Sequence, residues 1–300
     1  MAVPTLHLLI NPAAGRGRAG RRLARILALF QQAGLRPQVH VSTDTGDIES
    51  QARELTAEAD TAIIAAGGDG TVHEVVNGIL TAGAETPFGV VPVGTGNDFA
   101  KAAGVPLHWE TAVQLLADRI TSDTPPRRID AGRINDRYFS NGAGIGFDAV
   151  VTRIARSYEW RIGDLVYLVA IFRALASGVA SPRMTIRRGE EVLWDGPLTL
   201  ANTANGPWLG GMFHIAPDAH AADGELNLVV AGPVKRRRIL ALLPKLVRGT
   251  HLDEDDVYQW AVTRATITAD TPVESHLDGE VQAPQSSFDV EVLPGALRLL

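Results

Sequence analysis

Apolar runs and amphipathic stretches alternate over the first 125 residues of the chain. Four short apolar runs have the length and composition of strands: 6–11, 39–41, 61–65 and 88–91. Three stretches between them have the apolar spacing or the composition of helices: 23–30, 48–59 and 72–80. Strands that alternate with helices predict a parallel sheet with helices on both of its faces.

The pattern changes near Pro125 and Pro126, where short alternating segments separated by turn residues take over. Seven of these segments are predicted as strands: 129–134, 138–140, 184–187, 198–202, 226–230, 262–268 and 288–293. Two helical stretches interrupt them, at about 150–178 and 234–248. This pattern is typical of an antiparallel β-sandwich. We therefore predict a parallel α/β domain over 1–125 and a β-sandwich domain with helical insertions over 126–300.

Composition excludes several kinds of protein. The 300 residues are 45% hydrophobic, which is enough for a large core. The absence of cysteine excludes disulfides, thiolate metal sites and a cysteine nucleophile. A net charge of −6 argues against a nucleic-acid partner. A P-loop is also disfavoured, because the only lysines are Lys101, Lys235 and Lys245 and none of them lies in a GK[ST] element.

The chain shows no segment expected to cross or enter a membrane. Its longest apolar run, Leu165–Phe172, has eight residues, whereas a bilayer requires roughly 20. The first ten residues lack the basic region and cleavage site of a signal peptide. We expect a cytoplasmic protein that meets a membrane, if at all, at its inner surface.

Three glycine-rich loops follow predicted strands of the first domain, at 11–17, 65–71 and 92–98. Glycine lets the backbone approach a ligand closely, and the N-terminus of the next helix suits a phosphate. In a parallel sheet such loops lie at one edge, where ligands bind. An ordinary strand–helix turn is the alternative for any single loop, but three together indicate a nucleotide or polyphosphate site. Asp69 in the second loop would repel phosphate, so a metal-bridging or ribose-binding role is expected for it.

The order of these motifs resembles a known family. The GGDGT sequence is shared by phosphofructokinases, NAD kinases and the diacylglycerol and sphingosine lipid kinases. Three motifs in order look like the diacylglycerol kinase catalytic domain: Asn11-Pro-x-x-Gly15, Gly67-Gly-Asp-Gly-Thr-Val-His-Glu-Val-Val-Asn-Gly78 and Gly94-Thr-Gly-Asn-Asp-Phe-Ala100. Four later motifs resemble the soluble bacterial lipid kinases of that family: 144–148, 210–217, 223–226 and 277–280. His73 departs from the pattern, in which Asn is more usual.

The resemblance implies an ATP site built from the glycine loops and a few polar side chains. Its contacts would be Asn11, Ser42 or Thr43, Ala66, Gly67, Gly68, Asp69, Gly70, Thr71, Val72 and Thr95. The choice between the two hydroxyls stays open. The family's hydroxyl lies a fixed step before a Gly-Asp pair, here Gly46-Asp47, and this favours Ser42.

The resemblance also assigns carboxylates to catalysis and to Mg²⁺. Glu280 would accept the proton of the acceptor hydroxyl, and Asp278 could hold Mg²⁺ between the phosphates. Two carboxylates on a glycine turn are equally common at a solvated hairpin tip. A structural Mg²⁺ would be held by Asp223 and by the main-chain carbonyls of His220 and Glu225, since hard cations prefer oxygen ligands.

We expect an ATP- and Mg²⁺-dependent lipid kinase that phosphorylates a diacylglycerol-like lipid, and the resemblance also suggests a homodimer. An NAD or sugar kinase and a non-catalytic nucleotide-binding regulator are the alternatives. The arginines of 16–25 could contact anionic lipid or neutralise the charge of phosphate. The basic amphipathic segment 235–248 could also contact anionic lipid, although acidic residues 253–256 could instead balance it. An acceptor groove is expected near Trp160–Phe172.

Overall fold

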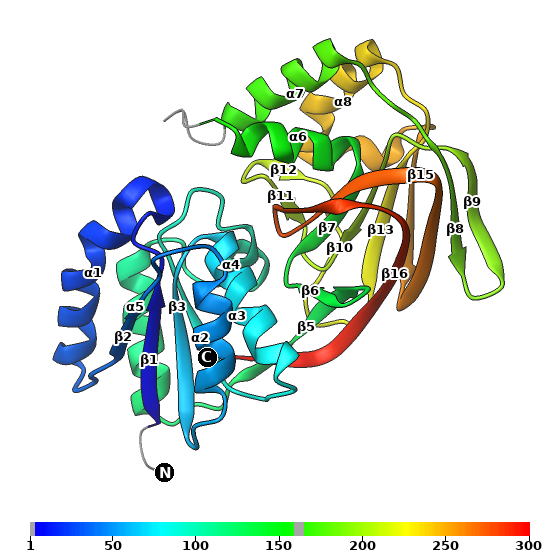
Figure 1. Ribbon diagram of the computed structural model, residues 1–300. Coiled ribbons are helices and arrows are strands. Elements are labelled where there is room, and N and C mark those ends of the chain that lie inside the picture. Colours follow the sequence, from blue (N-terminus) through cyan, green and yellow to red (C-terminus); the bar gives the residue numbers. More distant parts are fainter. Residues whose placement is uncertain (1–3, 159–164) are drawn as a thin grey trace. The chain divides into compact units, whose positions relative to one another are not determined.

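The computed structural model of the protein describes residues 4–158 and 165–300 (Figure 1). Contacts divide the chain into two compact units. Unit 1 runs to Asp130 and also includes Gly295–Leu300, whereas unit 2 is Ala131–Pro294. Trp160, which was expected near an acceptor groove, lies outside the described residues. No helix within the described ranges is long and apolar enough to cross a bilayer.

Unit 1 is built on a parallel sheet with the strand order β4-β3-β1-β2. These strands are β1 (Thr5–Ile10), β2 (Gln38–Val41), β3 (Thr61–Gly67) and β4 (Phe88–Pro92). Every residue of β3 is buried, which explains its continuous apolar sequence. The end of the long strand β16 (Glu280–Leu299) pairs in parallel with β4, with Leu299 opposite Phe88.

Helices cover the parallel sheet of unit 1 (Figure 1). α1 (Ala14–Gln32) and α5 (Trp109–Thr121) contact each other and share a core with the side chains of β1. α2 (Asp47–Leu55) and α3 (Asp69–Thr81) form a second contacting pair. The short helix α4 (Asp98–Ala102) follows β4. The parallel α/β architecture is confirmed, although α5 was not predicted.

Unit 2 is antiparallel. One path of strands runs β14-β13-β10-β7-β15-β16; β5 pairs with β16 and β6, and β8 pairs with β15 and β9. The strands are β5 (Arg127–Ile134), β6 (Arg137–Phe139), β7 (Gly142–Gly146), β8 (Arg183–Arg188), β9 (Glu191–Pro197), β10 (Leu200–Ala204), β13 (Leu226–Ala231), β14 (Val257–Val262) and β15 (Arg264–Leu277). A separate two-stranded ribbon contains β11 (Trp208–Leu209) and β12 (Phe213–His214).

Strand β15 pairs with several other strands of unit 2 and so joins them around one core. Its first half pairs with β8 and its last residues pair with β7, and its register is irregular between Thr268 and Ser275. Side chains from β7, β8, β13 and β15 therefore meet in a single apolar cluster. The predicted β-sandwich is confirmed. The predicted strand 262–268 was wrong in its bounds, because the chain passes from β14 into β15 at Thr263.

Three helices pack together in unit 2 (Figure 1). They are α6 (Phe147–Arg156), α7 (Leu165–Ser177) and α8 (Arg236–Arg248). The single helical stretch predicted over 150–178 is thus two helices, and α6 begins directly after the buried strand β7. The short 3₁₀ helix η1 (His251–Asp253) lies between α8 and β14.

Candidate active site

The three glycine loops of unit 1 meet at one edge of the parallel sheet. A Cβ atom on Gly94 would lie 2.3 Å from the Cα of Gly68, and one on Gly15 would lie 2.0 Å from the carbonyl oxygen of Val93. No side chain fits at these contacts, so the loops after β1, β3 and β4 form one surface of bare backbone. Arg18 ties them together, because its guanidinium donates to the carbonyls of Gly15 (2.8 Å) and Gly94 (2.9 Å).

The stretch from Ala66 to Val72 contains the end of β3, the connecting residue Gly68 and the first turn of α3. Gly68 is extended, and α3 begins at Asp69, so the first-turn N–H groups carry the partial positive charge of a helix N-terminus. A Cβ on Gly67 would lie 2.0 Å from the Thr71 hydroxyl oxygen, which therefore folds over the loop. The Asp69 carboxylate accepts the N–H of Phe99 at 3.1 Å. This contact fixes the start of α4 against the loop.

The predicted polar contacts lie on the neighbouring loops of unit 1. Asn11 directly follows β1, and its side-chain oxygen accepts the N–H of Ala13 at 2.9 Å. Thr95 is exposed in the loop after β4. These positions place an amide and a hydroxyl beside the bare backbone.

Ser42 and Thr43 both lie in the turn before α2. The Ser42 hydroxyl donates to the carbonyl of Asp44 at 2.9 Å, and the Thr43 hydroxyl donates to the Asp47 carboxylate at 2.7 Å. That hydrogen bond, with those from the N–H groups of Thr43 and Asp44, lowers the pKa of Asp47. Both hydroxyls are therefore engaged in the same turn, and the two residues remain alternatives.

Asp278 and Glu280 lie at the hairpin between β15 and β16. Asp278 and Gly279 both have positive φ angles, 50° and 88°, as in the tight turns that join antiparallel strands. The Asp278 carboxylate accepts the N–H groups of Ser140 (2.8 Å), Asn141 (2.8 Å) and Gly142 (3.0 Å). Its two oxygens therefore hold the hairpin against the chain before β7. Glu280 begins β16 and is partly exposed.

Two further side chains contact the same hairpin. Arg156, at the end of α6, makes an ion pair with Glu280 at 2.5 Å and donates to the carbonyl of Gly279 at 3.0 Å. His276 is fully buried, and its Nδ1 accepts the N–H of Gly279 at 3.3 Å. Together with Asp278, these contacts fix the main chain that carries Glu280.

A buried carboxylate, that of Asp148, lies beside His276. Asp148, in the first turn of α6, is 3.6 Å from Nε2 of His276 and accepts a hydrogen bond from Asn202 at 3.3 Å. A Cβ on Gly144 would lie 1.8 Å from Asp148 Oδ2 and 2.6 Å from His276 Nε2. The glycine thus makes room for the pair.

The predicted structural Mg²⁺ loop precedes β13. The exposed Asp223 carboxylate accepts the N–H of Glu225 at 3.0 Å, and the His220 carbonyl accepts the N–H of Ala222 at 2.8 Å. Within the described ranges, no group of three His, Asp or Glu side chains is placed to hold a metal. A cation here would need main-chain carbonyls beside the one carboxylate, and this donor set suits a hard cation.

Unit 2 also contains an apolar cavity of about 100 Å³ beneath its three helices. Its lining comes mainly from α6, α7 and α8, and includes Val151, Tyr167, Ile171, Leu242 and Leu246. The cavity wall is almost entirely apolar; such cavities stay dry and accept hydrocarbon guests. Tyr167 and Ile171 fall within the stretch that was expected near the acceptor. The contributions of α6 and α8 to the lining were not predicted.

Sequence reasoning missed Arg156, His276 and Asp148 as members of the site. Asp148 and His276 lie within or beside motifs that were singled out, 144–148 and 277–280, so their proximity to the motifs was a usable signal. Arg156 had no such signal, because it lies outside every motif and is 124 positions away from Glu280 in the sequence.

Comparison with known families divides the chain into two matched regions. Residues 5–129 match the diacylglycerol kinase catalytic domain. Residues 142–300 match the YegS C-terminal NAD kinase beta sandwich-like domain.

Curated relatives match over nearly the whole chain. The diacylglycerol kinase of Bacillus subtilis is 31% identical over 286 residues, which cover 91% of this chain and 89% of that protein. The diacylglycerol kinase of Mycobacterium tuberculosis H37Rv is 31% identical over 301 residues, which cover 97% of this chain and 93% of that protein.

Solved structures share the fold. A diacylglycerol kinase of Bacillus anthracis superposes with a TM-score of 0.75 at 21% identity, covering 100% of this chain and 97% of that one. Yeast NADH kinase complexed with NADH superposes with a TM-score of 0.56 at 11% identity, covering 96% and 78% of the two chains.

Proposed function

Since this chain belongs to the diacylglycerol kinase family, we propose that it transfers the γ-phosphate of ATP to a hydroxyl of a diacylglycerol-like lipid. The observation that carries the lipid acceptor is the apolar cavity in the unit that also contains Glu280. A water-soluble acceptor such as a sugar or NAD would leave this cavity without a use. One hydrocarbon chain of a lipid suits a dry apolar lining.

The proposed reaction assigns different tasks to the two units. The glycine-loop N–H groups of unit 1, with Arg18 beside them, would bind and neutralise the phosphates of ATP. In unit 2, Glu280 would take the proton of the acceptor hydroxyl. The acceptor oxygen then bonds to the γ-phosphorus, the bond from phosphorus to the β,γ-bridging oxygen breaks, and ADP leaves.

Asp278 has a positioning role in this proposal. Its oxygens accept three main-chain N–H groups and the Ser140 hydroxyl, so we infer that it orients the hairpin that carries Glu280. Mg²⁺ would be held by Asp223 and the carbonyls of His220 and Glu225, and when bound it would hold the 220–225 loop in a fixed conformation.

The exposed basic residues of α8 support an approach to anionic membranes. Arg236, Arg237 and Arg248 are exposed, as is Lys235 directly before the helix. The apolar side chains of Leu240 and Val247 on the same helix are exposed too. Such a mixture of cations and apolar side chains suits the surface of an anionic leaflet.

The test substitutes glutamine for Glu280, the proposed base. E280Q should lower kcat by about 100-fold or more, as is typical for loss of a general base. The matched control is E274Q, which removes a carboxylate from β15 that pairs with Arg153 at 2.8 Å, away from the hairpin. Phosphorylation of dioleoylglycerol in phosphatidylglycerol vesicles is measured with ³²P-ATP, with and without EDTA, beside NAD and glucose as acceptors.

The outcomes separate the alternatives. Loss of lipid phosphorylation in E280Q but not in E274Q, and its abolition by EDTA, support the proposal. A Mg²⁺ requirement that D223N leaves unchanged argues against the Asp223 loop. Phosphorylation of NAD or glucose in preference to lipid, or ATP binding without turnover of any acceptor, contradicts the lipid kinase assignment. Wild-type rates in E280Q exclude Glu280 as the base.

A further inference from the structure

The end of helix α6 contacts the hairpin that carries Glu280. The guanidinium nitrogen Nη1 of Arg156 bridges two groups: it lies 2.5 Å from Oε1 of Glu280 and donates to the Gly279 carbonyl at 3.0 Å. One nitrogen thus fixes both the side chain of Glu280 and the peptide before it. Because the contact engages Oε1, a hydroxyl proton would be accepted by Oε2.

Arg156 is well suited to hold a carboxylate in one direction. The guanidinium is always charged and rigid, and it offers several donors from one plane. Its place in the last turn of α6 is also favourable for a cation, because the C-terminus of a helix carries partial negative charge. The Arg156 side chain is 48% exposed, so packing in a core does not account for its presence at this position.

The same helix borders the apolar cavity. Phe147, Val151 and Thr152 of α6 line it, and Arg156 follows one turn after Thr152. α6 therefore has the proposed acceptor chain on one side and the proposed base at its end. A shift of this helix would move the carboxylate relative to the acceptor.

We propose that Arg156 is a positioning residue that orients the Glu280 carboxylate for proton transfer. This inference rests on the proposed function, in which Glu280 accepts the hydroxyl proton. The chemistry of the step is unchanged: Arg156 gains and loses no proton, and acts only through Glu280.

The test compares Arg156 with an arginine one turn earlier. Arg153 lies on the same helix and is 53% exposed, but its ion pair at 2.8 Å is with Glu274 of β15 instead of Glu280. R156Q should lower kcat about tenfold or more with little change in the KM for ATP, because small displacements of a catalytic group are costly. R156K should recover part of the rate, and R153Q should behave like the wild type. All variants are assayed with dioleoylglycerol in phosphatidylglycerol vesicles.

A double variant shows whether Arg156 acts through Glu280. If it does, R156Q/E280Q should be no slower than E280Q alone. The positioning role is overturned if R156Q keeps the wild-type kcat, if R153Q loses as much, if R156K recovers nothing, or if the double variant is slower than E280Q. A fall in the melting temperature of R156Q that accounts for the lost rate would also overturn it. Wild-type activity in E280Q would instead overturn the proposed base, and that result needs no Arg156 variant.

Discussion

Gly144 shows how one residue without a side chain can shape the site. It lies in the buried strand β7, and the space where its Cβ would stand is taken by the Asp148 carboxylate and the His276 ring. His276 in turn accepts the N–H of Gly279 beside Glu280. The absence of a Cβ at this position is thus linked to the placement of the hairpin that carries Glu280, the proposed base.

G144A should therefore be harmful both to folding and to activity. The added methyl group would overlap Asp148 and His276, and overpacking of this kind costs about 1–3 kcal/mol. We expect a lower melting temperature and a lower kcat. G142A on the same strand is the control, since its Cβ would come no closer than 3.5 Å to another atom. Equal melting temperatures for the two variants would show that Gly144 makes no such room.

The sequence predicted this region only in part. Gly144 and Gly146 belong to the motif 144–148, yet together with Gly142 they form a buried central strand, because β7 pairs with β10 and β15. Alternating glycines carry no apolar pattern from which a strand could be inferred. The need for glycine at 144 arises from both Asp148 and His276, and the contact with His276, far along the chain, is revealed only by the fold.

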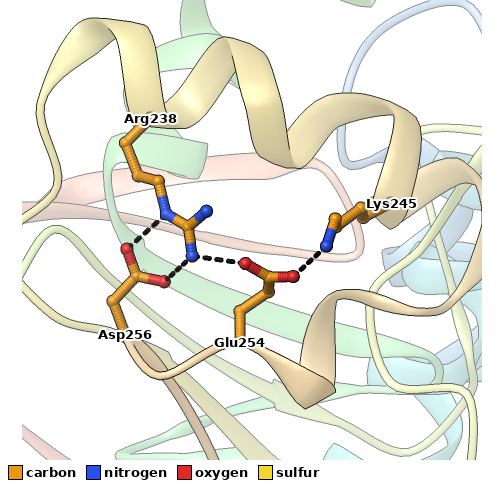
Figure 2. Close-up of polar contacts among 4 residues, drawn as sticks. All are labelled: Arg238, Lys245, Glu254 and Asp256. Atoms are coloured by element: carbon orange, nitrogen blue, oxygen red, sulfur yellow. Dashed lines mark hydrogen bonds and ion pairs between the residues drawn. The ribbon is translucent and has the colours of Figure 1, made fainter.

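At the scale of elements, α8 carries cations for two tasks: ion pairs within unit 2 (Figure 2) and the proposed contact with anionic lipid. Arg238 pairs with Asp256 and Glu254, and Lys245 pairs with the other oxygen of Glu254. These contacts hold α8 to the segment before β14, so this part of the predicted balance with 253–256 is present. The exposed cations Arg236 and Arg237 precede Arg238 directly in the chain.

Charge reversal should separate the two tasks. R236E/R237E should weaken binding to phosphatidylglycerol vesicles about tenfold or more at low salt, since each cation near an anionic surface contributes about 1 kcal/mol, and should leave the melting temperature unchanged. R238E should lower the melting temperature because it breaks the pairs with Glu254 and Asp256. Vesicle sedimentation and thermal unfolding measure the two effects. Unchanged vesicle binding in R236E/R237E would exclude membrane docking through α8.

At the scale of the whole molecule, stability should depend on two histidines, the half-buried His40 of unit 1 and the buried His251 of unit 2. Burial lowers the pKa of His40, as does the neighbouring ring of His7, and burial lowers the pKa of His251. A histidine with a lowered folded pKa favours its neutral form in the folded state. The unfolded chain therefore binds protons first as the pH falls.

The free energy of unfolding should thus decrease as the pH is lowered below about 6.5, the ordinary histidine pKa. Each histidine contributes a slope of at most about 1.4 kcal/mol per pH unit. Urea unfolding at pH 7.5, 6.5 and 5.5 measures the effect, and H40Q and H251Q should each flatten the dependence. A free energy that is constant over this range in the wild-type protein would contradict the assignment.

The architecture of each unit was easier to predict from the sequence than the return of the last strand to unit 1. Strand and helix periodicity in the first 125 residues predicted the parallel sheet, and the turn spacing beyond them predicted the sandwich. The return of Gly295–Leu300 to unit 1 was not predicted. A short apolar strand has the same pattern whichever sheet it joins, so its partner depends on contacts that no local pattern encodes.

That return strand has a consequence for synthesis on the ribosome. Leu299 pairs with Phe88, the N–H of Leu300 donates to the Phe88 carbonyl at 2.8 Å, and Gly295 donates to Asp130 at 2.7 Å. These partners in unit 1 emerge long before residues 295–300. This edge of β4 therefore stays unpaired until all of unit 2 has been translated. An interrupted chain would carry a parallel sheet with this edge unpaired, and such an edge is a template for pairing with other chains.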